Sequence, residues 1–140
     1  MVRSLQIPSR MGTVAFESLN SIRGKKVLVV DDNSESRQFL NRVLDLFGCE
    51  VDFATNGAEA VEQALAGDHD VVLMDLCMPV LNGQSATKQL RDAGYTRPIV
   101  GVTAEAKLVN AEDIEEIGFD ECLFKPVNRI KLVTLISELT

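Results

Sequence analysis

Short, mostly apolar runs alternate with longer segments of helical period from Lys26 onward. Such runs are typical of strands buried on both faces, and their alternation with helices indicates a parallel sheet covered on both sides. We therefore expect an α/β fold in a single domain, with a five-stranded parallel sheet and helices on both faces. The predicted strands are Lys26–Val30, Glu50–Ala54, Val71–Met74, Ile99–Val102 and Cys122–Phe124.

Three of the intervening segments carry apolar residues at the spacing of one helix face. Asn33 or Ser34 is expected to cap the first of these helices, and Gly48 to end it. A last helix is predicted over about Val127–Leu139, whose wide apolar surface fits either simple coverage of the sheet or an added contact with a partner or neighbouring segment. The three stripes are Phe39, Leu40, Val43, Leu44 and Phe47, then Ala58, Val61, Ala64 and Leu65, then Leu108, Ala111, Ile114 and Ile117.

Residues 1–23 show neither the short apolar runs of strands nor the apolar spacing of a helix face. Pro8, Gly12 and scattered serines are typical of a leader or linker, so we expect a leader over 1–23 and a folded domain over 24–140. Residues 1–26 hold five basic side chains and one acidic one, although the whole chain has a formal net charge of -7. The folded part therefore carries the acidic excess, which argues against direct contact with nucleic acid.

The number and spacing of the cysteines and histidines exclude two further classes of protein. Cys49, Cys77 and Cys122 form no CxxC pair and His69 is the single histidine, which excludes a disulfide framework and a Cys/His zinc site. We predict that Cys49 and Cys122 are small core or strand residues and that His69 lies at the surface. No apolar run approaches the roughly 20 residues that span a bilayer. These features favour a cytoplasmic chain without direct membrane contact, or the cytoplasmic part of a longer, membrane-bound parent protein.

Polar side chains stand at the carboxyl ends of four predicted strands. In an open parallel sheet these ends converge at the ligand-binding edge, so we expect the side chains to share one pocket. They are Asp31 and Asp32 after the first strand, Asp75 after the third, Thr103 after the fourth and Lys125 after the fifth.

The chemistry of this pocket follows from its charges. Three close carboxylates repel one another, and Lys125 alone does not balance them, so an oxygen-preferring cation such as Mg²⁺ is expected. A divalent ion with a lysine and the Thr103 hydroxyl would hold a phosphoryl group. A carboxylate can itself be the nucleophile, and Asp75 stands alone at a strand tip where a donor could reach it.

Four segments, in this order, resemble the receiver domain of two-component response regulators, and most of all the receiver domains of hybrid sensor histidine kinases. The resemblance covers about Lys26 to Leu139 and implies a flavodoxin-like (βα)5 fold. It also implies that Asp75 accepts a phosphoryl group from a histidine kinase or a histidine phosphotransfer domain, in a reaction that the receiver itself catalyses. The four segments are Val27–Asn33, Val71–Gly83, Pro98–Ala104 and Leu123–Pro126.

The resemblance further implies a ligand set for Mg²⁺. Asp32 and Asp75 would bind the ion directly, the backbone carbonyl of Cys77 would be a third protein ligand, and Asp31 would act through water. The same resemblance implies later loss of the phosphate, again catalysed by the receiver.

Lys125 and Thr103 would contact the phosphoryl oxygens, by the same resemblance. Thr103 would then move toward the phosphate, and the face formed by the fourth helix, fifth strand and fifth helix would change shape. Two positions depart from the usual family pattern: Cys122 stands where many members carry an aromatic residue, and Asn82 replaces a frequent aspartate. The aromatic half of the switch is therefore not expected here.

Several functional alternatives remain open. A leader before a terminal receiver favours part of a hybrid sensor histidine kinase, but a stand-alone response regulator has the same motifs. A phosphorylation-independent interaction module is also consistent with Cys122. A magnesium-dependent phosphatase is disfavoured because Cys77 replaces the general acid expected two residues after Asp75. A flavin protein is disfavoured because Asp31 and Asp32 would repel its phosphate.

Overall fold

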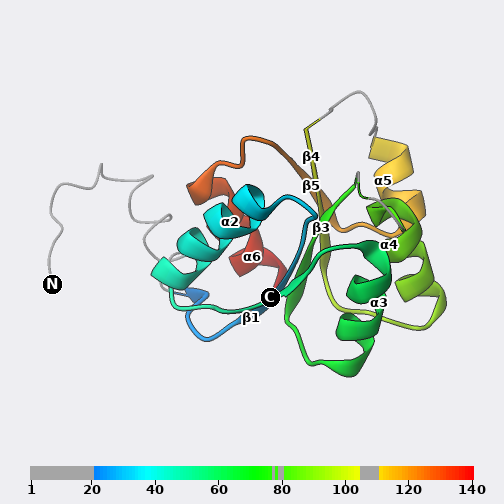
Figure 1. Cartoon of the computed structure of the whole chain (residues 1–140), viewed down its shortest axis with the longest axis horizontal. Coiled ribbons are helices and arrows are strands. Elements are labelled where there is room, and N and C mark those ends of the chain that lie inside the picture. Colours follow the sequence, from blue (N-terminus) through cyan, green and yellow to red (C-terminus); the bar gives the residue numbers. More distant parts are fainter. Residues whose placement is uncertain (1–20, 77, 79–80, 105–110) are drawn as a thin grey trace, which may run out of the picture.

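The computed structural model describes residues 21–76, 78, 81–104 and 111–140. Five strands, all parallel, form one sheet in the order β2-β1-β3-β4-β5 (Figure 1). This confirms the predicted fold class. The strands are β1 (Lys26–Val30), β2 (Glu50–Ala54), β3 (Val71–Asp75), β4 (Ile99–Thr103) and β5 (Glu121–Phe124).

Helices follow each strand and cover both faces of the sheet. Alternate residues of β1 point to opposite faces, so Val27 and Val29 pack with α2 and α6, whereas Leu28 and Val30 pack with α3 and α4. None of the helices in the described ranges is long and apolar enough to cross a membrane. The helices are α2 (Ser34–Leu46), α3 (Gly57–Ala66), α4 (Gly83–Asp92), α5 (Ala111–Ile117) and α6 (Arg129–Leu139).

The predicted stripe of α2 is confirmed, whereas that of α3 is rotated. In α3 the buried residues are Gly57, Ala60 and Ala64, while Ala58 and Leu65 are exposed. Small side chains let α3 pack closely against its neighbours, and this preference overrides burial of the larger leucine. Leu108, from the stripe expected before β5, lies outside the described residues.

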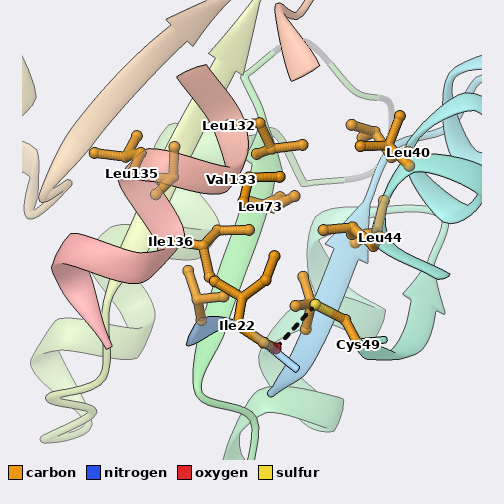
Figure 2. Packing of buried hydrophobic residues seen from close by; sticks show 14 of the residues in the cluster. Ile22, Leu40, Leu44, Cys49, Leu73, Leu132, Val133, Leu135 and Ile136 are labelled. Atoms are coloured by element: carbon orange, nitrogen blue, oxygen red, sulfur yellow. Dashed lines mark hydrogen bonds between the residues drawn. The ribbon is translucent and has the colours of Figure 1, made fainter. Parts of the chain in front are cut away.

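Residues just before β1 pack with the domain, although they fall within the predicted leader. Ile22 is fully buried among Leu44 and Ile136 (Figure 2), and its carbonyl accepts a hydrogen bond from Cys49 Sγ at 3.4 Å. The hydroxyl of Ser21 is hydrogen-bonded to that of Ser137 on α6. The wide apolar surface of α6 therefore meets a neighbouring segment of the same chain as well as the sheet.

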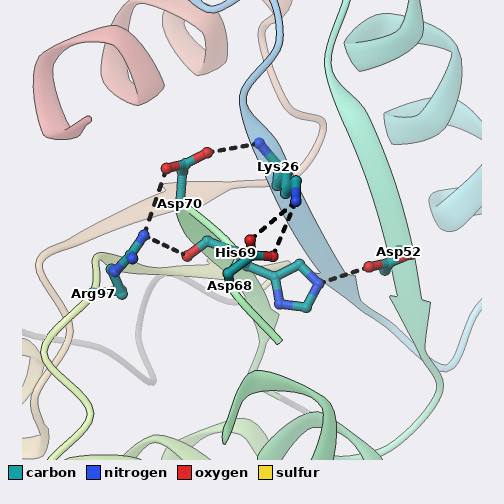
Figure 3. A network of polar contacts seen from close by, with 6 residues as sticks. All are labelled: Lys26, Asp52, Asp68, His69, Asp70 and Arg97. Atoms are coloured by element: carbon teal, nitrogen blue, oxygen red, sulfur yellow. Dashed lines mark hydrogen bonds and ion pairs between the residues drawn. The ribbon is translucent and has the colours of Figure 1, made fainter. Parts of the chain in front are cut away.

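His69 is buried, so its predicted surface position is wrong. Its side chain is 5% exposed, and Nε2 lies 2.8 Å from Asp52 Oδ2 on β2 (Figure 3). The ring packs against Gly67, where a side chain would collide with it. Flanking aspartates suggested a solvated loop, but they form ion pairs of their own while the ring turns inward. Those pairs are Lys26–Asp68 and Arg97–Asp70.

Both described cysteines are buried free thiols. Burial raises the pKa of the Cys49 thiol to about 11 and raises the pKa of Cys122 as well. Because the thiolate is the reactive form, both residues are chemically quiet near neutral pH. Their predicted core positions are confirmed.

Candidate functional site

The predicted site residues meet at the carboxyl edge of the sheet. Asp75 ends β3, which lies between β1 and β4, and the backbone N–H of Leu76 donates to the Val102 carbonyl at 3.1 Å. On the next strand pair, the N–H of Lys125 donates to the Thr103 carbonyl at 2.8 Å. The parallel register thus carries residues far apart in sequence to one edge.

Three carboxylates form the centre of this site. Asp31, Asp32 and Asp75 each offer an oxygen within 4.8 Å of the others. Asp31 and Asp75 are buried, at 1% and 6% exposure, whereas Asp32 is exposed. Clustered carboxylate oxygens open to solvent on one side suit a hard cation such as Mg²⁺. Cys77, whose carbonyl was predicted as a further ligand, lies outside the described residues.

Lys125 supplies the positive charge that faces this cluster. Its Nζ lies 3.0 Å from Asp31 Oδ2 and 3.8 Å from Asp75 Oδ2. It also donates to Ser36 Oγ at 3.4 Å. The ammonium therefore stands between the two buried carboxylates and closer to Asp31. Ser36 was not predicted as a site residue, and its only sequence signal is its place in the first turn after the aspartate pair.

The turn between β1 and α2 is fixed by its own hydrogen bonds. Asp31 Oδ1 accepts from the backbone N–H of Asn33 at 2.9 Å, and the Asp31 carbonyl accepts from Arg37 Nη1 at 2.8 Å. Asn33 Oδ1 in turn accepts from the backbone N–H of Ser36, which makes Asn33 the N-cap of α2. The Asp31 carboxylate thus projects from a turn that these hydrogen bonds hold in place.

Thr103 and Cys122 occupy the strands that flank the site on the other side. The Thr103 side chain is buried at the end of β4, and its backbone register partner on β5 is Phe124, which is 46% exposed. Cys122 pairs with Gly101 and is buried in the same cluster as Phe119. The position that is aromatic in many receivers is therefore a small core residue here.

Neutralising one carboxylate should stabilise the metal-free domain. We expect Asp32→Asn to raise the free energy of unfolding by about 1 kcal/mol in chelator-treated buffer, because it removes one of three mutually repelling charges. Added Mg²⁺ should stabilise the wild type more than the variant, which has one carboxylate fewer in the cluster. Urea denaturation with and without Mg²⁺ measures both effects.

The matched control for this experiment is Asp92→Asn, at an exposed aspartate that ends α4. Its free energy of unfolding should change little and should not depend on Mg²⁺. A metal-free Asp32→Asn variant less stable than the wild type would contradict the predicted repulsion.

A doubly wound parallel sheet with an acidic cluster and a lysine at its carboxyl edge defines the class of receiver-type α/β domains. The chain belongs to the response regulator receiver domain family, whose model matches residues 27–137. It is thus a receiver domain of the two-component phosphorelay type.

Curated relatives include both short and long proteins. Two-component system protein A of Emericella nidulans is 39% identical over 126 residues, which is 88% of this chain and 18% of that protein. Two-component response regulator 24 of Arabidopsis thaliana is 36% identical, over 90% of this chain and 92% of its own length. The osmosensing histidine protein kinase SLN1 of Saccharomyces cerevisiae is 37% identical, over 81% of this chain and 10% of that kinase. The chain is therefore homologous to receiver segments of much longer histidine kinases.

Solved structures of receiver domains have the same fold. The receiver domain of the sensor histidine kinase PA1611 from Pseudomonas aeruginosa, with magnesium coordinated in its active-site cleft, matches with a TM-score of 0.76 and 31% identity, over 83% of this chain and 97% of that one. The receiver domain of Saccharomyces cerevisiae Ssk1, in complex with the histidine phosphotransfer protein Ypd1, gives a TM-score of 0.75 and 30% identity. This match covers 84% of this chain and 89% of the solved chain. Magnesium in the active site is thus a property of receivers to which this chain is similar.

Proposed function

We propose that the chain accepts a phosphoryl group from a partner phosphohistidine onto Asp75, with Mg²⁺ bound beside it. The single observation that carries this proposal is the position of Lys125, whose ammonium lies between Asp31 and Asp75 at the rim of a carboxylate cluster. This arrangement suits an incoming group whose oxygens carry negative charge, because a cation is already in place within reach of the nucleophile.

Magnesium would be held by Asp32 and Asp75 directly, by Asp31 through water, and by the backbone carbonyl of Cys77. When bound, the ion offsets the carboxylate charge and supplies a Lewis acid for the phosphoryl oxygens. The grouping of three carboxylate oxygens within 4.8 Å of one another supports this assignment.

The transfer step forms one bond and breaks one. A carboxylate oxygen of Asp75 attacks phosphorus, the phosphorus–nitrogen bond of the donor breaks, and the imidazole nitrogen keeps the bonding electron pair. The product is an acyl phosphate on Asp75. Lys125 Nζ, 3.8 Å from Asp75 Oδ2, then pairs with a phosphoryl oxygen, and the Thr103 hydroxyl donates to another. The face formed by α5, β5 and α6 reports the change.

The parent protein and its partner follow from chemistry and similarity together. We propose that the chain is part of a hybrid sensor histidine kinase and that it exchanges phosphate with a histidine kinase or histidine phosphotransfer domain, in the cytoplasm. Similarity to a segment of a histidine kinase and to a receiver bound to a phosphotransfer protein supports this. The two cysteines within the described residues are free thiols, which fits a reducing compartment, and the net charge of -7 fits a chain without nucleic-acid contact.

The experiment is phosphoryl uptake followed by intact mass, with a phosphorylated phosphotransfer protein or an acyl phosphate as donor. The wild type should gain one phosphoryl group in the presence of Mg²⁺ and none after chelation. Asp75→Asn should gain none under either condition, whereas the exposed control Asp92→Asn should behave like the wild type. Uptake by Asp75→Asn would contradict the assigned acceptor.

A second candidate function is an interaction module that is recognised without phosphorylation. The buried Cys122 favours it, because a small side chain at this position lacks the bulk with which an aromatic ring would fill or vacate space as it rotates. This candidate predicts that the wild type takes up no phosphate from either donor while the same partner still binds.

A further inference from the structure

Four residues beside the acceptor form a closed ring of hydrogen bonds. Asp31 Oδ1 accepts from the Asn33 N–H at 2.9 Å, and Asn33 Oδ1 accepts from the Ser36 N–H at 2.9 Å. Ser36 Oγ accepts from Lys125 Nζ at 3.4 Å, and the same ammonium donates to Asp31 Oδ2 at 3.0 Å. The ring joins the rigid turn before α2 to the lysine that follows β5.

Ser36 differs from the other two acceptors around the ammonium in its charge. A lysine ammonium has three N–H donors, and the oxygens arranged around it are Asp31 Oδ2, Ser36 Oγ and, at the longer distance of 3.8 Å, Asp75 Oδ2. The net charge around both carboxylates changes when a cation binds or when a phosphoryl group arrives. The hydroxyl is neutral and belongs to a backbone held by the N-cap, so the arrival of either group leaves its charge unchanged.

We infer that Ser36 is a positioning residue that holds the Lys125 ammonium beside Asp75 while Lys125 exchanges Asp31 for the incoming phosphoryl group. This inference rests on the proposed function. A free lysine side chain loses considerable rotamer entropy when it is fixed in one place. The Ser36 contact meets part of that cost before the donor arrives, and it leaves the ammonium with a fixed neutral acceptor when the contact with Asp31 is given up.

The test uses three variants in the same helical turn. Ser36→Ala removes the hydroxyl, whereas Ser36→Thr keeps it and adds a methyl group, for which there is room because Ser36 lines a cavity of about 510 Å³. Ser34→Ala is the matched control, because Ser34 is an exposed first-turn residue of α2. The rate constant for Mg²⁺-dependent uptake from an acyl phosphate is measured by intact mass, and the Mg²⁺ dissociation constant by titration.

Ser36→Ala should slow phosphoryl uptake about tenfold, the effect of losing one hydrogen bond to a charged group. Ser36→Thr and Ser34→Ala should stay close to the wild-type rate. The Mg²⁺ affinity should be the same in all four proteins, since Ser36 contacts Lys125 and not the carboxylates, whereas a merely structural defect would change affinity and rate together.

Three results would overturn the inference. Equal uptake rates for Ser36→Ala and Ser34→Ala would remove the role of the hydroxyl but leave the proposed function intact. A rate loss in Ser36→Ala accompanied by an equal loss of Mg²⁺ affinity would assign the effect to the fold of the site. Absence of uptake by the wild type would instead remove the proposed function, and the inference with it.

Discussion

Replacing Gly83 by alanine should lower the free energy of unfolding by about 3 kcal/mol, at the upper end of the usual cost of overpacking. A Cβ atom at this first residue of α4 would overlap the carbonyl oxygen of Asp75 and stand 3.0 Å from Leu76 Cα. These are backbone atoms at the end of a buried strand, so they have little freedom to move away. The Gly83 N–H also donates to the Leu76 carbonyl at 3.2 Å, which fixes the close approach.

Urea denaturation of wild type and variant measures the loss. Gly94→Ala is the matched control, because Gly94 has a φ of +90° and, among the described atoms, none lies within 4 Å of its hypothetical Cβ. It should cost only about 1 kcal/mol through backbone strain. If Gly83→Ala cost no more than Gly94→Ala, close packing of α4 on the acceptor strand would not be a source of stability.

Truncating Ile22 to alanine should cost about 3 kcal/mol, because its side chain is fully buried and its removal leaves a cavity next to α2 and α6. The control is Leu46→Ala, at a leucine that is 67% exposed and should change stability by less than about 0.5 kcal/mol. Denaturation curves with unchanged slope would report the difference directly. Similar costs for the two variants would show that residues before β1 contribute nothing to the core.

Strands and site were predictable from sequence because the same physical rule governs both. Apolar runs identify buried parallel strands, and the polar residue that ends each run must then stand at the shared carboxyl edge. Asp75 and Thr103 illustrate this, since each extends its predicted strand by one residue. The approach of Lys125 to Asp31 does not follow from the strand order, because β3 and β4 lie between β1 and β5, so the side chains must reach across the carboxyl edge of the sheet.

The remaining features depend on tertiary contacts that leave little periodic signal. His69 has two charged neighbours, and only the path of β2 brings Asp52 within reach of its ring. Ile22 is a lone apolar residue before Arg23 and Gly24, so no pattern predicts its burial. Ser36 becomes important only because Lys125, 89 residues away, reaches back to it.

The parallel sheet also separates the point of tethering from the point of chemistry. Chain entry through Ser21 and Ile22 is at the amino edge of the sheet, next to α6. The carboxylates stand at the opposite edge, beyond the 5 residues of β1, which is roughly 15 Å of extended chain. The residues through which the chain enters β1 and the carboxylate cluster are therefore separated by the length of one strand, so the entry segment and the site do not compete for the same edge of the sheet.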